Sequence, residues 1–558
     1  MKGEVIMKST TRIRRHEAFV AAATALVIVG CSQGTSNSPG NDESDAADAT
    51  GRDTLEVAIA QEPTDLVPYT AGQQGKSMTF DLVFMPLLYT DDENEVQSDI
   101  LESWELDDSA TTVTLRLRDN LTWSDGEQLT SADVVMTLTQ ALDPNISIMA
   151  GPMAGVVGTD EFAEGAANEI SGLSAPDEKS VVIDLADPDA TWLPNLVLRK
   201  LPILPQHILG EVPHDELAEH EFFRTVPVSS GPYTLKEHQS GQYLEFEKNM
   251  EWQPGAAFDR VTFRVVSVDV MSAQLETGEI QFMFSIDPTD VERVGALESI
   301  EVESTSGIAP GVWAIQHFEP LLDPQVRQAM AYAIDREAIC DAVYKGYCET
   351  PIANIRQLGP EWAIPEDDVT EYRYNPERAR QLLDEAGWDS DTELTFLLFA
   401  HVTGAPKRAI EIAQGNMADV GINWSIETID VAEFLDRAAE EPDSFHGFYT
   451  AGADFTVDPS SVEAYTSCES HYPNGSNIIR YCNEELDDHW RTGRRESSAE
   501  KRAAVYQRAF RLLNEEVPEI YLLVPDSIIA YDSRLKGVRV HSNKDMQFWN
   551  IGEWTWEE

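Results

Sequence analysis

Basic residues are scarce in this chain. Its 558 residues include 40 Lys and Arg against 98 Asp and Glu, for a formal net charge of −58. Such a chain repels the phosphates of DNA and RNA, which argues against nucleic-acid binding. A high net charge is most often typical of a disordered chain. Here hydrophobic residues make up 42% of the chain, which includes 12 Trp, and apolar periodicity runs through its body. We therefore expect a folded protein, long enough for two or more domains.

The acidic residues are spread along the whole sequence rather than gathered in one tail. This distribution is typical of the surface of a halophilic protein. In molar salt the Debye length falls to about 3 Å, so self-repulsion between the carboxylates is screened. We therefore expect the protein to keep its fold in concentrated salt and to lose structure on dilution.

Common catalytic motifs are missing. The sequence contains no G-x-S-x-G, no H-E-x-x-H and no G-x-G-x-x-G. Gly75, Lys76 and Ser77 imitate the end of a phosphate-binding loop, but Thr70 stands where its first glycine is required. Pairs of carboxylates carry no catalytic information in so acidic a composition. The sequence therefore predicts no enzyme activity, and it indicates no cofactor.

Long hydrophobic runs are also missing, except for one at the start of the chain. Residues 18–30 are apolar and follow a basic region that ends in Arg14 and Arg15. The run is too short for a comfortable membrane span, and the pattern is typical of an export signal over residues 1–30. The two arginines resemble those of a twin-arginine signal.

Cysteine is rare, and the first cysteine follows the apolar run directly. Gly30 and Cys31 resemble the lipobox of secreted lipoproteins, in which the cysteine is lipidated and becomes the mature N-terminus. Residues 32–53 are polar and contain almost no large apolar residue, a composition typical of a flexible tether. Residues 31–53 are therefore predicted to be a lipid-anchored tether that holds the protein at the outer face of a membrane.

The other four cysteines form an even set, as expected for disulfides in an exported protein. Proximity in the sequence favours the pair Cys468–Cys482 and, less strongly, Cys340–Cys348. A zinc site is disfavoured because there is no C-x-x-C and no matching histidine spacing, so no metal is predicted.

Strands and helices alternate through the body of the chain. Val113, Leu115 and Leu117 alternate with polar residues, as in a half-buried strand. Thr130 and Asp133 have the spacing of a capping box at the start of a helix.

The same criteria predict further elements. The expected strands are 55–60, 262–266, 312–318 and 394–399, and the expected helices are 80–88, 272–277, 323–343, 376–386 and 409–420. Residues 305–311 are rich in Gly, Ser and Pro and are expected to form a hinge. This mixture of strands and crossover helices predicts an α/β fold with mixed sheets.

Several segments resemble one protein family in order along the chain. They are 97–138, with E-S-W, W-S-D-G and a capped helix; 226–233, V-P-V-S-S-G-P-Y; 275–280, L-E-T-G-E-I; 326–337, V-R-Q-A-M-A-Y-A-I-D-R-E; and 374–388, Y-N-P-E-R-A to L-L-D-E-A-G-W. From these segments the chain is identified as a member of the extracytoplasmic solute-binding proteins of peptide-type ABC transporters, family 5. The resemblance covers about residues 53–550, and the acidic surface indicates a haloarchaeal member.

This resemblance implies a two-lobed fold that closes on its ligand around a hinge. Lobe I would comprise 54–311, with an extra subdomain at 97–207, and lobe II would comprise 312–524. Residues 525–558 would return to lobe I. The implied function is to capture a peptide outside the cell and to deliver it to the permease of an ABC transporter, without catalysis.

The resemblance also points to candidate ligand contacts. In peptide-binding members an aspartate of a G-W-x-x-D-x-x-D-P stretch pairs with the α-amino group of the peptide, and Asp454 matches it. Here the tryptophan is missing, and the spacing from Asp454 to Asp458 is one residue longer. Dipeptide-type members carry an arginine in the loop that follows residues 394–399. This loop has no arginine, and His401 is a contact candidate.

Other ligands and activities remain open at the level of sequence. Oligosaccharides and metal chelates are alternatives within the same transporter type, and the 12 Trp permit a sugar site. An extracellular hydrolase is an alternative of another class.

Overall fold

The computed structural model describes residues 53–557 with short gaps. The gaps are 71–73, 148–149, 152, 199–200, 285, 352, 354–361, 366–367, 452–457 and 474. The chain divides into two units, Met1–Ala49 and Thr50–Glu558, and all described residues belong to the second. The expected export signal, Cys31 and Asp454 lie outside the described residues.

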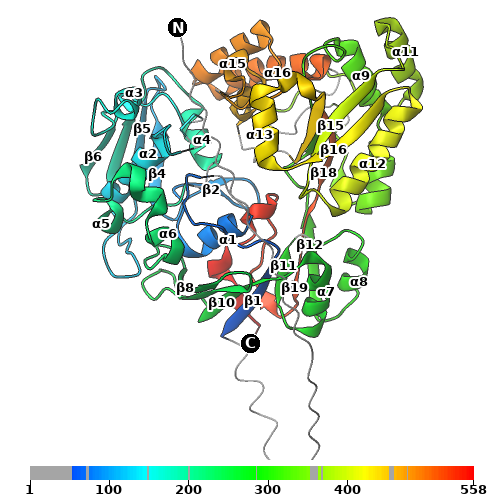
Figure 1. Cartoon of the computed structure of the whole chain (residues 1–558). Helices are drawn as coiled ribbons and strands as arrows, with labels where there is room; N and C mark the ends of the chain where they lie inside the picture. The colour runs from blue at the N-terminus through cyan, green and yellow to red at the C-terminus, as the bar shows by residue number, and fades with distance from the viewer. Residues whose placement is uncertain are drawn as a thin grey trace, which may run out of the picture. The chain divides into compact units, whose positions relative to one another are not determined.

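A seven-stranded sheet holds the first strand of the chain near its centre. Its order is β12-β19-β11-β1-β10-β9-β8. β1 (Thr54–Ile59) runs parallel to both of its neighbours, and the other adjacent pairs are antiparallel. The remaining strands are β8 (Tyr233–Gln239), β9 (Tyr243–Lys248), β10 (Arg260–Val265), β11 (Phe282–Phe284), β12 (Ile300–Thr305) and β19 (Ser527–Asp532). Thus β19, from the C-terminal part of the chain, inserts between β11 and β12 (Figure 1).

A smaller antiparallel sheet is built from the segment between β1 and β8. Its order is β4-β5-β7-β6, with β4 (Leu101–Leu106), β5 (Thr112–Leu117), β6 (Leu173–Asp177) and β7 (Ser180–Asp184). The predicted strand is confirmed, because Val113, Leu115 and Leu117 are buried on one face of β5. The predicted capping box is also confirmed at α2 (Ser131–Leu142), where the Thr130 N–H donates to Asp133 Oδ2 at 2.7 Å.

A six-stranded sheet is formed by the second half of the chain. Its order is β14-β18-β13-β17-β15-β16. Its strands are β13 (Gly311–Ile315), β14 (Cys348–Glu349), β15 (Glu393–Phe399), β16 (Asn423–Ile429), β17 (Gly447–Ala451) and β18 (Glu519–Pro525). β15 is parallel to both β16 and β17, which requires the crossover helices α12 (Gly404–Asp419) and α13 (Val431–Glu440).

Further helices belong to the same half of the chain. α11 (Pro376–Ala386) matches its prediction, with proline in the first turn and Gly387 at φ 70° as the stop. The others are α9 (Pro324–Ala333), α10 (Arg336–Ile339), α14 (Glu463–Thr466), α15 (Glu484–Arg495) and α16 (Ala499–Glu516).

The predicted helical region over 323–343 is helical in the structure but is interrupted once. α9 ends before Ile334, which has extended backbone at φ −90° and ψ 121°. Asp335 then starts α10, since its side chain accepts the Ala338 N–H at 3.0 Å. A competing side-chain cap thus restarts the helix within an otherwise periodic sequence.

The predicted helix over 80–88 is wrong in its position. α1 spans Gln74–Val83 and ends before Pro86. Proline lacks an N–H donor and disfavours helical backbone at the preceding residue, which explains the earlier end. The other helices of this half are α3 (Thr159–Ala163), α4 (Trp192–Leu198), α5 (Gln206–Leu209), α6 (Phe222–Thr225), α7 (Val268–Thr277) and α8 (Val291–Gly295).

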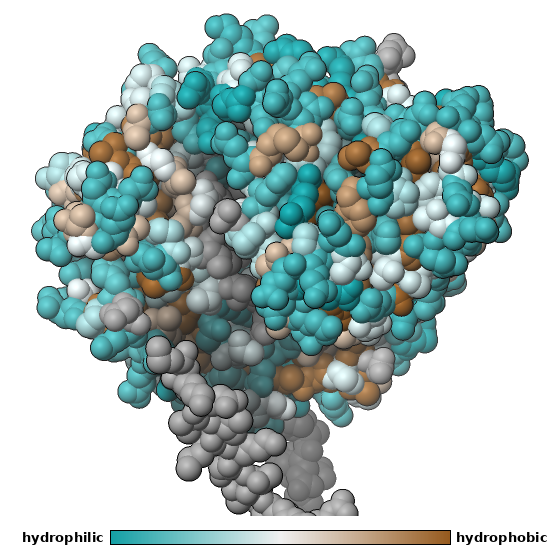
Figure 2. All heavy atoms as spheres, turned by 45° about the horizontal axis from the view of Figure 1, so that its top comes forward, coloured by the Kyte–Doolittle hydropathy of each residue, from teal (hydrophilic) through white to brown (hydrophobic). Residues whose placement is uncertain are grey.

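The two large sheets have separate hydrophobic cores. The core that covers the seven-stranded and four-stranded sheets includes Trp123, Phe263 and Trp554, whereas that of the six-stranded sheet includes Trp313 and Trp424. Each half therefore excludes water by itself. On the face seen in Figure 2, hydrophilic residues cover most of the surface, as expected from the net charge of −58.

Two short segments connect the large sheets. The first runs from β12 to β13 through 305–311, and the second is Asp526 alone, between β18 and β19. Gly307 is required in the first segment, because a Cβ atom there would lie 2.1 Å from the carbonyl oxygen of Pro525. The segment expected to form a hinge thus packs directly against the second connection.

Candidate functional site

The carboxyl ends of the parallel strands meet at one edge of each large sheet. In the six-stranded sheet, β15, β16 and β17 end at the same edge, and Gly311 pairs with Ala451 there. In the seven-stranded sheet, β1 and β11 end at the edge where Thr305 pairs with Ser527. The connecting segments join these two edges. Ligands of open α/β sheets bind outside the carboxyl ends of the strands, so this is the place to expect a site.

An ion pair crosses between the two edges. Arg408, in the helix that follows β15, places Nη2 3.6 Å from Oδ2 of Asp287, which follows β11. Burial acts to raise the pKa of Asp287, but hydrogen bonds from Thr289 and the charge of Arg408 outweigh it and hold that pKa below its usual value. The carboxylate is therefore charged and attracts the arginine across the gap.

His401 lies in the loop after β15 and is exposed. Its ring stacks on that of Phe399, with centroids 5.5 Å apart and an interplanar angle of 9°. Phe399 packs in turn against Phe434 of α13 at 5.0 Å. His401 therefore stands at the carboxyl edge, at the same edge as Ala451, the last described residue before the segment that contains Asp454.

Asp458, the first described residue after the segment that contains Asp454, forms a buried ion pair. Asp458 Oδ2 lies 2.5 Å from Nη2 of Arg502 on α16, and the two side chains are only 2% and 9% exposed. Asp458 Oδ1 also accepts the Ser460 N–H at 3.0 Å, which caps the short helix Pro459–Val462. The chain is thus held firmly from residue 458 onward.

Arg502 joins this anchor to neighbouring elements. Its Nε donates to the Gly493 carbonyl of α15 at 3.2 Å, and its guanidinium lies 5.5 Å from the ring of Trp362 and 5.3 Å from that of Tyr506. Burial acts to lower the pKa of Arg502, but attraction to Asp458 outweighs it and raises that pKa. No single motif in the sequence marks this pair.

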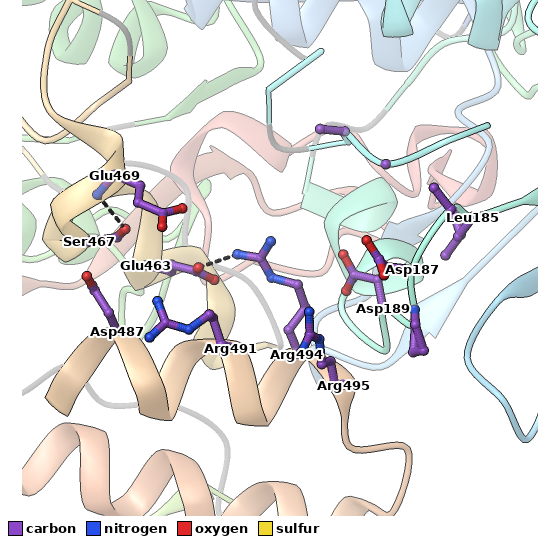
Figure 3. Close-up of a pocket in the computed structure, with 14 residues that line it drawn as sticks. Leu185, Asp187, Asp189, Glu463, Ser467, Glu469, Asp487, Arg491, Arg494 and Arg495 are labelled. Atoms are coloured by element: carbon purple, nitrogen blue, oxygen red, sulfur yellow. Dashed lines mark hydrogen bonds and ion pairs between the residues drawn. The ribbon is translucent and has the colours of Figure 1, made fainter. Parts of the chain in front are cut away.

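A second contact between the two halves involves α15. The Ala190 N–H donates to the Arg494 carbonyl at 2.7 Å. Beside this hydrogen bond lies a cavity of about 300 Å³ (Figure 3). It is lined by Ala154, Gly155, 185–189, Glu463, Ser467, Glu469, Asp487, Arg491, Arg494 and Arg495. No motif in the sequence predicts this cavity, although the spacing of Arg491, Arg494 and Arg495 is visible there.

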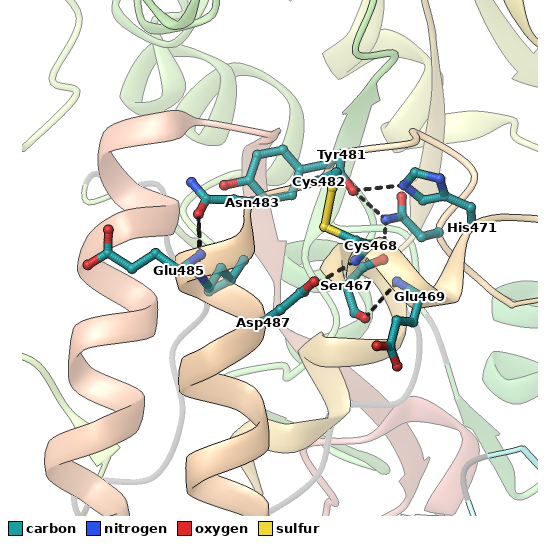
Figure 4. The surroundings of a disulfide bond; sticks show 11 residues. Ser467, Cys468, Glu469, His471, Tyr481, Cys482, Asn483, Glu485 and Asp487 are labelled. Atoms are coloured by element: carbon teal, nitrogen blue, oxygen red, sulfur yellow. Dashed lines mark hydrogen bonds between the residues drawn. A yellow bond between two sulfur atoms is a disulfide. The ribbon is translucent and has the colours of Figure 1, made fainter.

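The predicted cysteine pairs are bonded in the structure. Cys468 joins Cys482 across a Cα–Cα distance of 4.5 Å, and Cys340 joins Cys348 at 6.0 Å. The first bond lies next to the start of α15, where Asp487 Oδ1 accepts the Cys468 N–H at 3.2 Å (Figure 4). It ties α15 to the chain segment that follows α14.

The described residues contain neither a membrane-spanning helix nor a cluster of metal ligands. No helix in the described part of the chain has both the length and the apolar character needed to cross a membrane. Within the same part, no three His, Cys, Asp or Glu side chains are grouped so that they could hold a metal ion.

Comparison with known proteins gives consistent matches. Residues 95–472 match the family model described as bacterial extracellular solute-binding proteins, family 5. Oligopeptide-binding protein AppA of Bacillus subtilis (strain 168) is 26% identical over 552 residues, which cover 96% of this chain and 97% of that protein.

Solved structures match over a similar extent. AppA from Bacillus subtilis in complex with a nonapeptide aligns with a TM-score of 0.75 and 23% identity, over 90% of this chain and 99% of that one. NikZ from Campylobacter jejuni in complex with Ni(L-His) aligns with a TM-score of 0.74 and 21% identity, over 90% and 99% of the two chains. The predicted two-lobed α/β fold is therefore confirmed.

Proposed function

We infer that this chain, which belongs to family 5 of the bacterial extracellular solute-binding proteins, captures peptides outside the cell and delivers them to the permease of an ABC transporter. The observation that carries the proposal is the meeting of two carboxyl strand edges, joined by two short connections and bridged by Arg408 and Asp287. The relative AppA is named an oligopeptide-binding protein, which favours a peptide as the ligand.

The proposed lobes follow the two large sheets. Residues 54–311 and 525–558 form lobe I, with 97–207 as its subdomain, and 312–524 form lobe II. Rotation about the two connections would open and close the gap between the sheet edges, and a ligand that contacts both lobes would favour the closed form.

Asp454 is the proposed partner of the peptide α-amino group, and His401 is a proposed second contact. A carboxylate–ammonium pair shielded from water gives a strong charge-assisted hydrogen bond. Both residues follow strands whose carboxyl ends share one edge, and the buried pair of Asp458 and Arg502 fixes the chain four residues after Asp454.

The proposed location is the outer face of the cell membrane. Export by the twin-arginine route, lipidation of Cys31 and a tether over 32–53 would hold the binding domain near its permease. The variant Cys31→Ser tests the anchor. It is expected to be released from membranes and to bind peptides as the parent protein does.

The protein is also proposed to be halophilic, on the strength of its net charge of −58. Circular dichroism during dilution from molar to low salt tests this proposal. Loss of secondary structure is expected, and a stable fold without added salt would contradict it.

Native mass spectrometry of the protein purified from its source tests the proposed ligand. Masses of bound peptides support the proposal. A bound sugar or a metal chelate such as a nickel–histidine complex would overturn it, as would turnover of peptides or glycosides in a hydrolysis assay.

A further inference from the structure

The cavity between residues 185–189 and α15 is not used by the proposed peptide contacts. Its two walls come from different halves of the molecule, and the Ala190–Arg494 hydrogen bond of 2.7 Å holds them side by side. A volume of about 300 Å³ holds roughly ten water molecules at about 30 Å³ each. A small organic molecule of a similar number of non-hydrogen atoms would fill it.

Three arginines from the last turns of α15 form one wall. Arg491, Arg494 and Arg495 share a helix face because side chains three and four residues apart are neighbours. Arg491 pairs with Asp488 on its own helix, and Arg494 pairs with Glu463 of α14. Within the described ranges, Arg495 has no hydrogen-bond or ion-pair partner. Its guanidinium is therefore available to a carboxylate, which it can bind with two parallel hydrogen bonds.

The facing wall carries an available carboxylate. Asp189 is engaged, since its Oδ1 accepts the N–H and the hydroxyl of Thr191 at 2.8 and 2.6 Å. Asp187 has no partner in the part of the chain that the structure describes. In Figure 3 Arg494 and Arg495 lie between Glu463 on one side and Asp187 and Asp189 on the other, whereas Arg491 extends toward Asp487.

Acidic side chains outnumber arginines around the cavity, so a simple anion would meet repulsion. The groups without partners are of both signs, which favours a ligand that carries both charges. We propose that the cavity binds a small zwitterion, whose carboxylate accepts hydrogen bonds from Arg495 and whose ammonium donates to Asp187. Because these residues come from opposite walls, the bound zwitterion favours the arrangement in which the walls face each other.

A free amino acid and a short peptide share this chemistry. Isothermal titration calorimetry of the intact protein in molar salt distinguishes them, with L-alanine and L-alanyl-L-alanine as probes and N-acetyl-L-alanine amide as the uncharged analogue. Binding is measured in the Asp454→Ala background, so that the proposed peptide contact does not contribute. At least one zwitterion is expected to bind saturably, and the uncharged analogue is not.

Variants at the cavity decide the assignment. Asp187→Asn and Arg495→Gln each remove one charge-assisted contact, so each is expected to weaken zwitterion binding at least tenfold. Both side chains are largely at the surface, and such exchanges usually change stability little. Glu469→Gln, an exposed acid on the same cavity, is the matched control and is expected to stay within threefold of the parent protein.

Three results would overturn the proposal: no binding of either zwitterion, unchanged binding by both variants, or equal loss in the Glu469→Gln control. The capture of longer peptides by the variants is measured in parallel. If the zwitterion site fails while peptide capture persists, the proposed function stands without this site.

Discussion

Removing the charge of Asp458 should destabilise the half of the protein that holds the six-stranded sheet. Asp458→Asn keeps an oxygen that can still accept the Ser460 N–H, so the exchange isolates the ion pair with Arg502. It leaves a guanidinium of 9% exposure without its counter-charge. Breaking a buried ion pair by removing one partner costs about 3–5 kcal/mol, which is the expected loss in the free energy of unfolding.

Further variants separate the contribution of the helix cap from that of the ion pair to the free energy of unfolding. Asp458→Ala removes the cap as well and should cost roughly 0.5–2 kcal/mol more. Arg502→Met in combination with Asp458→Asn removes both partners. The double variant should therefore be more stable than the sum of the single losses predicts, because no unpaired charge stays buried.

Denaturant unfolding in molar salt, followed by tryptophan fluorescence, measures these losses. Glu371→Gln is the control, since its ion pair with Arg373 is exposed at 41% and 59% and should contribute at most about 1 kcal/mol. A loss for Asp458→Asn no larger than that of the control would refute the structural role of the buried pair.

Further predictions concern the contact between the halves, acid stability and a disulfide. Asp287→Asn removes the ion pair with Arg408, whose two side chains are 33% and 45% exposed. We expect the free energy that favours the closed arrangement of the two halves to fall by less than about 1 kcal/mol, and the radius of gyration measured by small-angle X-ray scattering to increase. An unchanged radius of gyration would count against this contact. Burial and a nearby positive charge lower the pKa of His317 to about 3. Because the unfolded chain takes up this proton near pH 6.5, stability should be lost as pH falls from there toward 3, by about 2 kcal/mol between about pH 7 and 5, and His317→Gln should remove that part of the pH dependence. Exchange of Cys468 and Cys482 for Ala should lower the free energy of unfolding by about 3 kcal/mol, since the bond closes a loop with a sequence separation of 14; equal stability would show that it constrains little.

Local signals in the sequence predicted local structure well. Thr130 and Asp133 form the predicted capping box, and α11 begins at its proline and ends before its glycine. Both features depend only on residues within one or two helical turns of one another. The predicted helical region at 323–343 is interrupted at Ile334, where the cap by Asp335 competes with the helix and Asn416 Oδ1 accepts the Asp335 N–H at 3.1 Å. That partner lies far away in the sequence.

The candidate site shows the same division. The position of His401 directly after a strand could be predicted, because the signal for the strand over 394–399 is a continuous stretch; the role of Asp454 stays a prediction. The ion pairs at the sheet edges could not be predicted, since Arg408 meets Asp287, and Arg502 meets Asp458, only after the chain has folded. In a sequence with 98 acidic residues, nothing marks which carboxylate each arginine meets.

Peptide titration of the Asp454→Ala variant tests the central claim most directly. Isothermal titration calorimetry in molar salt would compare this variant with the parent protein, using a peptide identified from the purified protein. We expect saturable binding by the parent and a loss of at least tenfold in the variant, since a desolvated charge pair contributes about 1.5–3 kcal/mol. Equal affinities would remove Asp454 from the site, and no binding of any peptide by the parent protein would contradict its assignment as a peptide receptor.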